Sequence, residues 1–254
     1  MSHSIEVSEN AGVRSLHFGS SWIQGAMRVA RPYALELEYT REMMAALLLR
    51  PESEYEGWPR RVLQIGLGAG SLTKFLWRQF LETRLTIVEI NPAVVGVAYA
   101  SFRLPDDSQR IHIEIADGVE FVEEDQAEYD LILVDGFDDK ARAGKLDAVP
   151  FYAACRRRLA EDGLMVVNLL GHYRGFKGAL ERISDAFDGR ALLFPSCDSG
   201  NAIAFAAVGE PVAIPLSDLK TSAQALKTDT GLNLLPTLAR LQTAASCKEG
   251  TLRL

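Results

Sequence analysis

The clearest pattern along the chain begins at Val62, where short β-rich apolar runs alternate with longer stretches of helical periodicity. The apolar runs are VLQIG, LTIVEI, IHIEIA and YDLILVD, and the intervening runs are SLTKFLWRQFL, PAVVGVAYASF and GVEFVEE. Strands that alternate with amphipathic helices indicate βαβ units and a mostly parallel sheet with helices on both faces. The sequence therefore predicts a doubly wound, Rossmann-like α/β fold.

The same alternation continues to about residue 207. The run PFYAACRRRLAEDG predicts a helix that ends at Gly163, LMVVNLL predicts a fifth strand, and FKGALERISDAF predicts a further helix. The runs RALLFP and AIAFAAV are expected to form a final pair of strands.

The chain on either side of this body has a different character. Strand-like segments cover residues 15–18 and 22–29, and helical periodicity covers residues 35–49. After the body, the run EPVAIP predicts a linker, and the remaining residues are expected to be helical. We therefore predict a short N-terminal β segment at residues 1–34, a Rossmann-like catalytic domain at residues 35–210, and a linker with a C-terminal helical tail at residues 211–254.

Composition excludes several functional classes. The 254 residues carry a formal charge of −7, which argues against a nucleic-acid partner and is compatible with a cationic substrate. No apolar run reaches about 18 residues and the start is too polar for a signal peptide, so neither a membrane span nor export is indicated and a cytoplasmic protein is expected. Cys155, Cys197 and Cys247 are too widely spaced for a zinc motif, and no metal is expected.

A glycine-rich loop follows the first strand of the body. Gly66, Gly68 and Gly70 lie where this strand ends, and glycines there allow tight turns and a close approach of the backbone to a ligand. Glu89 ends the next strand, where a carboxylate can accept hydrogen bonds from a ribose diol. A dinucleotide fingerprint would place its third glycine at Ser71, so the spacing favours a nucleoside ligand without a pyrophosphate.

Two further strands also end in acids. Asp117, followed by Gly118, ends the third strand, where a carboxylate can accept from an adenine amino group, and Asp135 ends the fourth. Each aspartate could instead cap the helix or turn that follows it. Ligands in doubly wound sheets bind at the carboxyl ends of the strands. Three successive strands that finish in acids therefore suit a cationic nucleoside such as a sulfonium.

The segment from Val62 to about Gly163 resembles the spermidine synthase, or aminopropyltransferase, family, which has the S-adenosylmethionine-dependent methyltransferase fold. The resemblance rests on VLQIGLGAGS, on VEINPAVV, on IEIADGVEFV with YDLILVDGFDD, and on FYAACRRRLAEDGLMVVN. Weaker likeness extends upstream through GSSWIQGAMRV and EYTREMMAALLL. The resemblance implies a class I methyltransferase-type sheet and an adenosyl-sulfonium co-substrate, either S-adenosylmethionine or its decarboxylated form.

The resemblance also implies roles for individual residues. The implied binding set for the co-substrate is Gln24, Gly66, Gly68, Ala69, Gly70, Glu89, Ile90, Asp117 and Gly118. Asp135 would bind and deprotonate the attacking amine, which is almost wholly protonated at neutral pH because an alkylamine has a pKa of ~10. Asp138 would assist it and, with Asp139, would hold the distal cation of a diamine; the alternative for this pair is a solvated acidic loop.

Two positions depart from the family pattern. The loop aspartate that binds the amino group of decarboxylated S-adenosylmethionine is here Ala69. Its absence loses a charge-assisted hydrogen bond of about 1.5–3 kcal/mol and favours a donor that keeps its carboxylate. Arg41 takes the place of the glutamine before Glu42 and Met43. It would bind a carboxylate of the substrate if it pointed into the site, and it would otherwise lie on the solvent face of its helix.

Three functions fit these observations. The first is aminopropyl transfer to a diamine such as putrescine with Asp135 as base, favoured by the likeness over the whole segment. The second is methyl transfer from S-adenosylmethionine to an unknown acceptor, favoured by Ala69. The third is a non-catalytic nucleoside-binding homologue. The resemblance also makes a homodimer through the N-terminal strands plausible.

Overall fold

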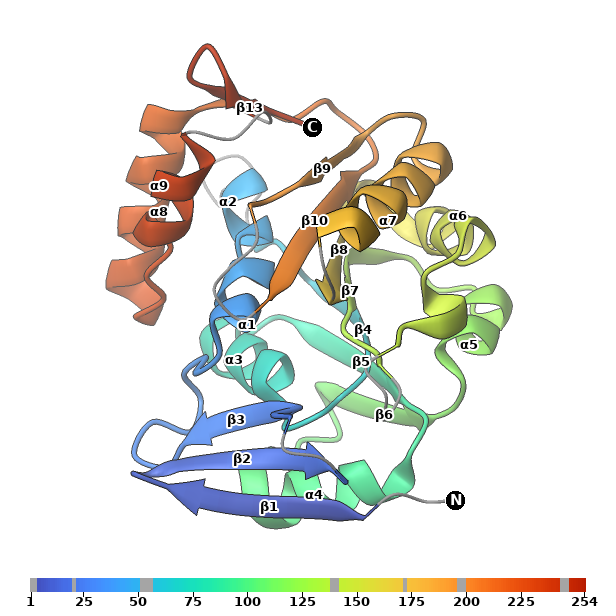
Figure 1. The fold of residues 1–254 in the computed structure, drawn as a ribbon, viewed down its shortest axis with the longest axis vertical. Helices are drawn as coiled ribbons and strands as arrows, with labels where there is room; N and C mark the ends of the chain where they lie inside the picture. Colours follow the sequence, from blue (N-terminus) through green and yellow to red (C-terminus); the bar gives the residue numbers. More distant parts are fainter. Residues whose placement is uncertain are drawn as a thin grey trace.

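The computed structural model describes residues 4–19, 22–50, 57–137, 142–170, 173–195, 200–242 and 247–254, and it contains one large central sheet (Figure 1). The strands of this sheet are β4 (Arg61–Ile65), β5 (Arg84–Glu89), β6 (Ile111–Ile115), β7 (Tyr129–Val134), β8 (Leu159–Leu170), β9 (Ala191–Leu193) and β10 (Asn201–Ala207). Their order is β6-β5-β4-β7-β8-β10-β9. Strands β4 to β8 are parallel, and β10 runs antiparallel to both of its neighbours.

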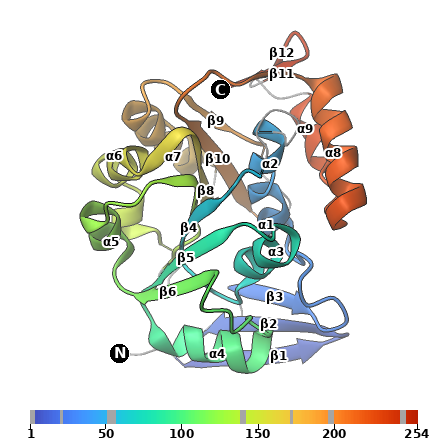
Figure 2. The ribbon, with the colours of Figure 1, turned by 180° about the vertical axis from the view of Figure 1, so that it is seen from behind.

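Both faces of this sheet are buried because successive residues of its strands are apolar and point to opposite sides. Val62 and Leu131 pack on one side, whereas Leu63 and Ile132 pack on the other. The first face is covered by α1 (Glu38–Met43), α2 (Ala46–Leu49), α3 (Ser71–Gln79) and α4 (Pro92–Phe102), and the second by α5 (Gly118–Glu124), α6 (Val149–Arg157) and α7 (Tyr173–Ala186). Figure 2 shows the two layers from behind. The prediction of a doubly wound α/β fold is confirmed.

A separate antiparallel sheet precedes this body. It consists of β1 (Ile5–Asn10), β2 (Val13–Phe18) and β3 (Gly25–Arg28), in that order. The sequence pattern did not predict β1. The sheet lies against α4 and the glycine loop, where Leu16 and Met27 are fully buried beside Phe102 (Figure 1).

The C-terminal segment is a mixed unit and not only a helical tail. Besides α8 (Leu216–Thr230) and α9 (Leu235–Leu241), it contains β11 (Ala213–Pro215), β12 (Cys247–Lys248) and β13 (Thr251–Arg253), which form a three-stranded sheet in the order β11-β13-β12. The two helices lie outside α1 and α2 (Figure 1). Their leucines, among them Leu219 and Leu238, belong to the same apolar cluster as Met43 and Leu47. The unit therefore completes the core on this side of the sheet.

Two predicted helices differ from those in the structure. The helix expected to reach Gly163 ends at Arg157, and β8 begins at Leu159 with a register shift against β7. The helix expected over residues 35–49 is divided into α1 and α2. Among the described helices, none combines the length and the apolar character that a membrane span requires.

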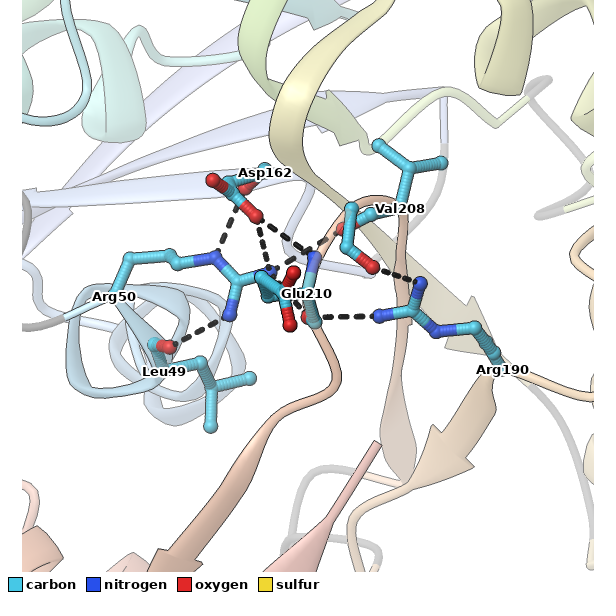
Figure 3. A network of polar contacts seen from close by, with 7 residues as sticks. Leu49, Arg50, Asp162, Arg190, Val208 and Glu210 are labelled. Carbon is cyan, nitrogen blue, oxygen red and sulfur yellow. Dashed lines mark hydrogen bonds and ion pairs between the residues drawn. The ribbon is translucent and has the colours of Figure 1, made fainter.

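A buried guanidinium fixes the end of α2 against the sheet (Figure 3). Arg50, which is 3% exposed, donates from Nε to the carbonyl of Asp162 over 2.9 Å and from Nη2 to the carbonyls of Val208 and Glu210, each over 3.3 Å. Arg190 donates to the same Glu210 carbonyl over 3.0 Å. A buried cation needs such partners because its desolvation is costly. The network joins α2, the irregular part of β8 and the segment that leads from β10 to β11.

Candidate active site

A pocket of about 770 Å³ lies at the carboxyl ends of the parallel strands. The register aligns Ile65 with both Val88 and Val134, so the residues that follow these three positions meet at one edge of the sheet. The predicted site residues that line the pocket are Gln24, Gly66, Gly68, Glu89, Ile90, Asp117, Gly118 and Asp135. The remaining wall comes from the N-terminal segment, from α1, from β8 and β10, and from the loop that precedes α6.

The glycine loop allows two strand ends to approach each other closely. Gly66 has φ +89°, and a Cβ built on it would lie 2.3 Å from the carbonyl oxygen of Asp135. The backbone N–H of Asp135 donates to the carbonyl of Ile65 over 2.9 Å. Only glycine combines this left-handed conformation with so close a contact. The residue at position 66 therefore determines how near the loop lies to Asp135.

The carboxylate of Glu89 is held by backbone N–H donors on both of its oxygens. Its Oε2 accepts from the backbone N–H of Leu67 and its Oε1 accepts from that of Asn91, each over 2.9 Å. Burial raises the pKa of this carboxyl, and the backbone donors oppose that shift. An ionised carboxylate has about four lone-pair positions, and the hydrogen bonds from Leu67 and Asn91 use one on each oxygen.

Asp117 has the capping role that the sequence offered as an alternative, and its contact with an adenine stays a prediction. It caps α5, because its Oδ1 accepts from the backbone N–H of Val119 over 2.8 Å and from that of Glu120 over 3.4 Å. The same residue lines the pocket. The cap fixes the side chain at the wall, next to Gly118, where a Cβ would lie 2.6 Å from Ile65 Cγ2.

Asp135 is held by side chains on both carboxylate oxygens. Tyr39 donates its hydroxyl to Oδ2 over 3.2 Å, and Asn168 donates Nδ2 to Oδ1 over 2.8 Å. Burial raises the pKa of the Asp135 carboxyl, while the two hydrogen bonds oppose the shift. Burial and the nearby carboxylate also raise the pKa of Tyr39, so its hydroxyl stays a donor. A carboxyl with a raised pKa is closer to the range in which a general base is most effective.

Tyr39, Asn168 and Asn201 were not predicted as site residues from the sequence. The signal was present, because Asn168 is a single polar residue inside the apolar run LMVVNLL and is 4% exposed. A buried side-chain amide in a central strand has to find partners. Its partners are Asp135 and Asn201.

The charges on the pocket wall suit a cationic ligand. Among the described residues, four carboxylates and two cations line it. The carboxylates are Glu38, Glu89, Asp117 and Asp135, and the cations are Arg142 and Lys145. Within the described part of the chain, no three His, Cys, Asp or Glu side chains cluster as metal ligands would.

Three predicted site residues lie elsewhere. Ala69 is 2% exposed and packs with Leu16 and Met27 under the N-terminal sheet, and so it does not line the pocket. Gly70 has φ +65° and approaches Leu104, so it shapes the loop and not the wall. Arg41 donates Nη1 to the backbone carbonyls of Leu35 and Glu36, over 3.1 and 2.7 Å, and does not reach the pocket.

The carbonyls that precede α1 bind the Arg41 guanidinium, so this geometry does not support the expected contact with a substrate carboxylate, which stays a prediction. Ala69 packs in the cluster of Leu16, Met27 and Phe102 and is not part of the pocket wall, and the contact of residue 69 with the co-substrate stays a prediction. Asp138 and Asp139 lie outside the described residues, and their role stays a prediction.

Comparisons with known proteins agree on the family. The model of the spermine/spermidine synthase domain matches residues 38–172. The polyamine aminopropyltransferase of Neisseria meningitidis serogroup A is 34% identical over 238 residues, which cover 94% of this chain and 89% of that protein. The polyamine aminopropyltransferase of Chromobacterium violaceum matches with the same identity and coverage.

Solved structures share the fold. A protein described as a probable spermidine synthase from Corynebacterium glutamicum superposes with a TM-score of 0.73 at 20% identity, over 90% of this chain and 91% of that one. Human methyltransferase-like protein 13, in complex with SAH, gives a TM-score of 0.67 at 26% identity, over 77% of this chain and 93% of that one. The central sheet is thus of the methyltransferase type. By its sequence over nearly its whole length, the chain belongs to the spermine/spermidine synthase family.

Proposed function

We propose that the protein transfers an aminopropyl group from decarboxylated S-adenosylmethionine to a primary amine of a small polyamine such as putrescine. The identity of 34% with polyamine aminopropyltransferases over 94% of the chain supports this class of transferase. The observation that carries the proposed chemistry is the carboxylate of Asp135, held on both oxygens at the wall of a pocket that also contains Glu89.

In this proposal the pocket binds the adenosyl part through residues at the strand ends. Glu89 accepts the ribose hydroxyls on the lone pairs that Leu67 and Asn91 leave unused. Asp117 and Gly118 lie beside the adenine, and the exposed side chain of Ile90 covers one face of the base. The carboxylates of the wall stabilise the positive sulfonium centre and the ammonium groups of both substrates.

Asp135 binds the attacking amine and takes its proton. The amine nitrogen attacks the propyl carbon next to sulfur, so a C–N bond forms while the C–S bond breaks. The electron pair of the C–S bond stays on the sulfur, and methylthioadenosine leaves as a neutral thioether. Asp135 takes the proton of the amine before the attack, because the bound ammonium has no lone pair until it is deprotonated, and the alkylated nitrogen then becomes a secondary ammonium as the C–N bond forms. Tyr39 and Asn168 keep the carboxylate ionised and in a fixed orientation for this step.

Ala69 no longer favours methyl transfer over aminopropyl transfer. That reading required residue 69 to face the tail of the donor, whereas the methyl group of Ala69 is packed under the N-terminal sheet. For the distal ammonium of the acceptor, Asp138 and Asp139 remain the proposed partners, and Gln24 is proposed to lie against the nucleoside. A homodimer remains a prediction from the resemblance.

The test is an assay of the purified protein with decarboxylated S-adenosylmethionine and putrescine. Release of methylthioadenosine together with spermidine is expected, and S-adenosylmethionine should not replace the donor. Asp135→Asn should lower kcat at least about 100-fold, because the amine loses its proton acceptor. Asp188→Asn, an isosteric change at an exposed aspartate on the opposite layer, should leave kcat unchanged. Formation of S-adenosylhomocysteine, or no methylthioadenosine with any small polyamine, would contradict the proposal.

A further inference from the structure

A chain of two buried amides leads from β10 to the carboxylate of Asp135. Asn201 donates Nδ2 to Oδ1 of Asn168 over 2.8 Å, and Asn168 donates Nδ2 to Oδ1 of Asp135 over 2.8 Å. The two asparagines are 7% and 4% exposed. Polar side chains buried to this degree have to satisfy their hydrogen bonds within the protein. Asn201 donates to Asn168 for this purpose, and Asn168 donates to Asp135.

The strand register places the three side chains on the same face of the sheet. In the antiparallel pair of β8 and β10, Asn168 lies opposite Ile203 and Leu170 lies opposite Asn201. Asn168 and Asn201 are therefore diagonal neighbours on one face, close enough for their side chains to meet. Strand alternation places Asp135 on this face as well, which is the face that α1 covers with Tyr39.

The direction of the hydrogen bonds in this chain is fixed by chemistry. An ionised carboxylate only accepts hydrogen bonds, so Asn168 has to present its NH2 group to Asp135. This leaves the carbonyl oxygen of Asn168 facing Asn201, and residue 201 has to be a donor. If residue 201 were an acceptor, Asn168 would gain a hydrogen bond by rotating its amide through 180°, and its oxygen would then face the carboxylate.

We propose that Asn201 is a positioning residue for the transfer reaction and acts through Asn168 to keep a hydrogen-bond donor on Asp135. The inference rests on the role of Asp135 as the base in the proposed function. With Asn168 on Oδ1 and Tyr39 on Oδ2, the plane of the carboxylate is fixed, and its remaining lone pairs face the amine.

Other titratable groups surround the base, and Asn201 adds no charge to them. Tyr39 contacts Asp135 from α1. The others on the pocket wall are Glu38 from α1, Glu89 and Asp117 from the strand ends, and Arg142 and Lys145 from the loop before α6. An effect of residue 201 on the pH profile should therefore arrive through the Asn168 amide.

The test uses Asn201→Asp, which keeps the size of the side chain but replaces the donor by an acceptor. We expect kcat to fall about 10- to 100-fold, because Asp135 loses a charge-assisted hydrogen bond. The acid limb of the profile of kcat against pH should move to higher pH. Asn201→Leu removes the donor without a new acceptor, and it should have a smaller effect in the same direction.

The two variants are repeated in an Asn168→Leu background. If Asn201 acts through Asn168, Asn201→Leu, which introduces no charge, should change kcat by no more than about twofold there. An equal loss in both backgrounds would show a direct effect of charge or packing on Asp135, and it would overturn the inference. So would an Asn201→Asp enzyme with an unshifted acid limb. Should Asn201→Asp fail to fold, the Asn201→Leu cycle makes the same test without a charge.

A readout without turnover separates this inference from the proposed function. The carboxyl carbon of Asp135 can be titrated by 13C NMR in the wild-type protein and in the variants at residue 201. The midpoint of this titration should lie at higher pH in Asn201→Asp than in the wild type. A shifted midpoint in a protein that releases no methylthioadenosine would contradict the proposed function alone. An active enzyme whose midpoint ignores residue 201 would contradict the inference alone.

Discussion

The hydroxyl of Tyr39 donates a hydrogen bond to Asp135 Oδ2 over 3.2 Å, although 96 positions separate the two residues. This contact joins α1, which precedes the central sheet in the chain, to the end of β7 in the middle of that sheet. Burial raises the pKa of both groups. The tyrosine therefore acts as a permanent donor that helps to keep the aspartate ionised.

Tyr39→Phe removes this donor and is expected to lower kcat/KM about tenfold at neutral pH, since a hydrogen bond to a charged group contributes about 1.5–3 kcal/mol. Its loss leaves the burial of Asp135 less compensated, so the pKa of this carboxyl rises further and the acid limb of the rate profile moves to higher pH. Tyr99→Phe, on the exposed side of α4, is the matched control and should match the wild type. An unshifted acid limb in Tyr39→Phe would argue against this role.

Glu89→Gln should weaken binding of methylthioadenosine about 10- to 100-fold, as measured by calorimetry. The glutamine NH2 group would oppose one of the two backbone N–H donors that now bind the carboxylate, and the hydrogen bonds to the ribose would lose their charge. Glu114→Gln makes the same change on the neighbouring strand, at a side chain that is 45% exposed. Equal affinities in the two variants would show that Glu89 does not contact the ribose.

Lys74 should make the stability of the protein depend on pH. It is 1% exposed and donates Nζ to the carbonyl of Phe102 over 2.7 Å. Burial, with a smaller contribution from Arg103, lowers its pKa to about 7. Between this value and the unfolded pKa of ~10.4, the unfolded chain binds a proton that the folded protein does not. The free energy of unfolding therefore increases as the pH rises through this range, because the buried amine no longer has to carry a charge.

The contribution of Lys74 to the free energy of unfolding should increase by about 2 kcal/mol from pH 7 to pH 9. Urea denaturation of the wild type and of Lys74→Met at the two pH values measures this difference. The increase should be smaller by that amount in Lys74→Met and unchanged in Lys220→Met, which alters an exposed lysine of α8. Identical pH dependence in all three proteins would contradict the assignment.

Gly66→Ala should destabilise the protein by about 2–4 kcal/mol in urea denaturation. The cost combines a left-handed conformation that alanine disfavours with the displacement of the Asp135 backbone, 2.3 Å from the new Cβ. Gly231→Ala provides the control, because Gly231 has φ +78° at the end of α8 but no atom within 4 Å of a Cβ. It should cost only about 1 kcal/mol. An equal loss in the free energy of unfolding for the two variants would show that the close approach at Gly66 does not contribute to the destabilisation.

Much of the central domain could be predicted from the sequence because its elements are long and periodic. The runs that became β4, β5, β6 and β7, and the helices between them, were identified in order. Errors arose where local pattern was weak. The end of α6 was placed six residues too late, since the residues after Arg157 keep a polar, helix-like composition but pair with β7. The strands of the C-terminal unit are only two or three residues long and form by pairing residues 213–215 with 251–253.

The sequence by itself determined the glycine loop, its spacing and the acids that end three successive strands, because each depends on local residues and on the rule that parallel strands end at one edge. Only the tertiary structure decided which side chains meet there. It turned Ala69 under the N-terminal sheet, bound Arg41 to backbone carbonyls, and brought Tyr39, Asn168 and Asn201 to Asp135. These contacts depend on strand order, register and the position of α1, and such relations between distant segments leave no periodic trace in the chain.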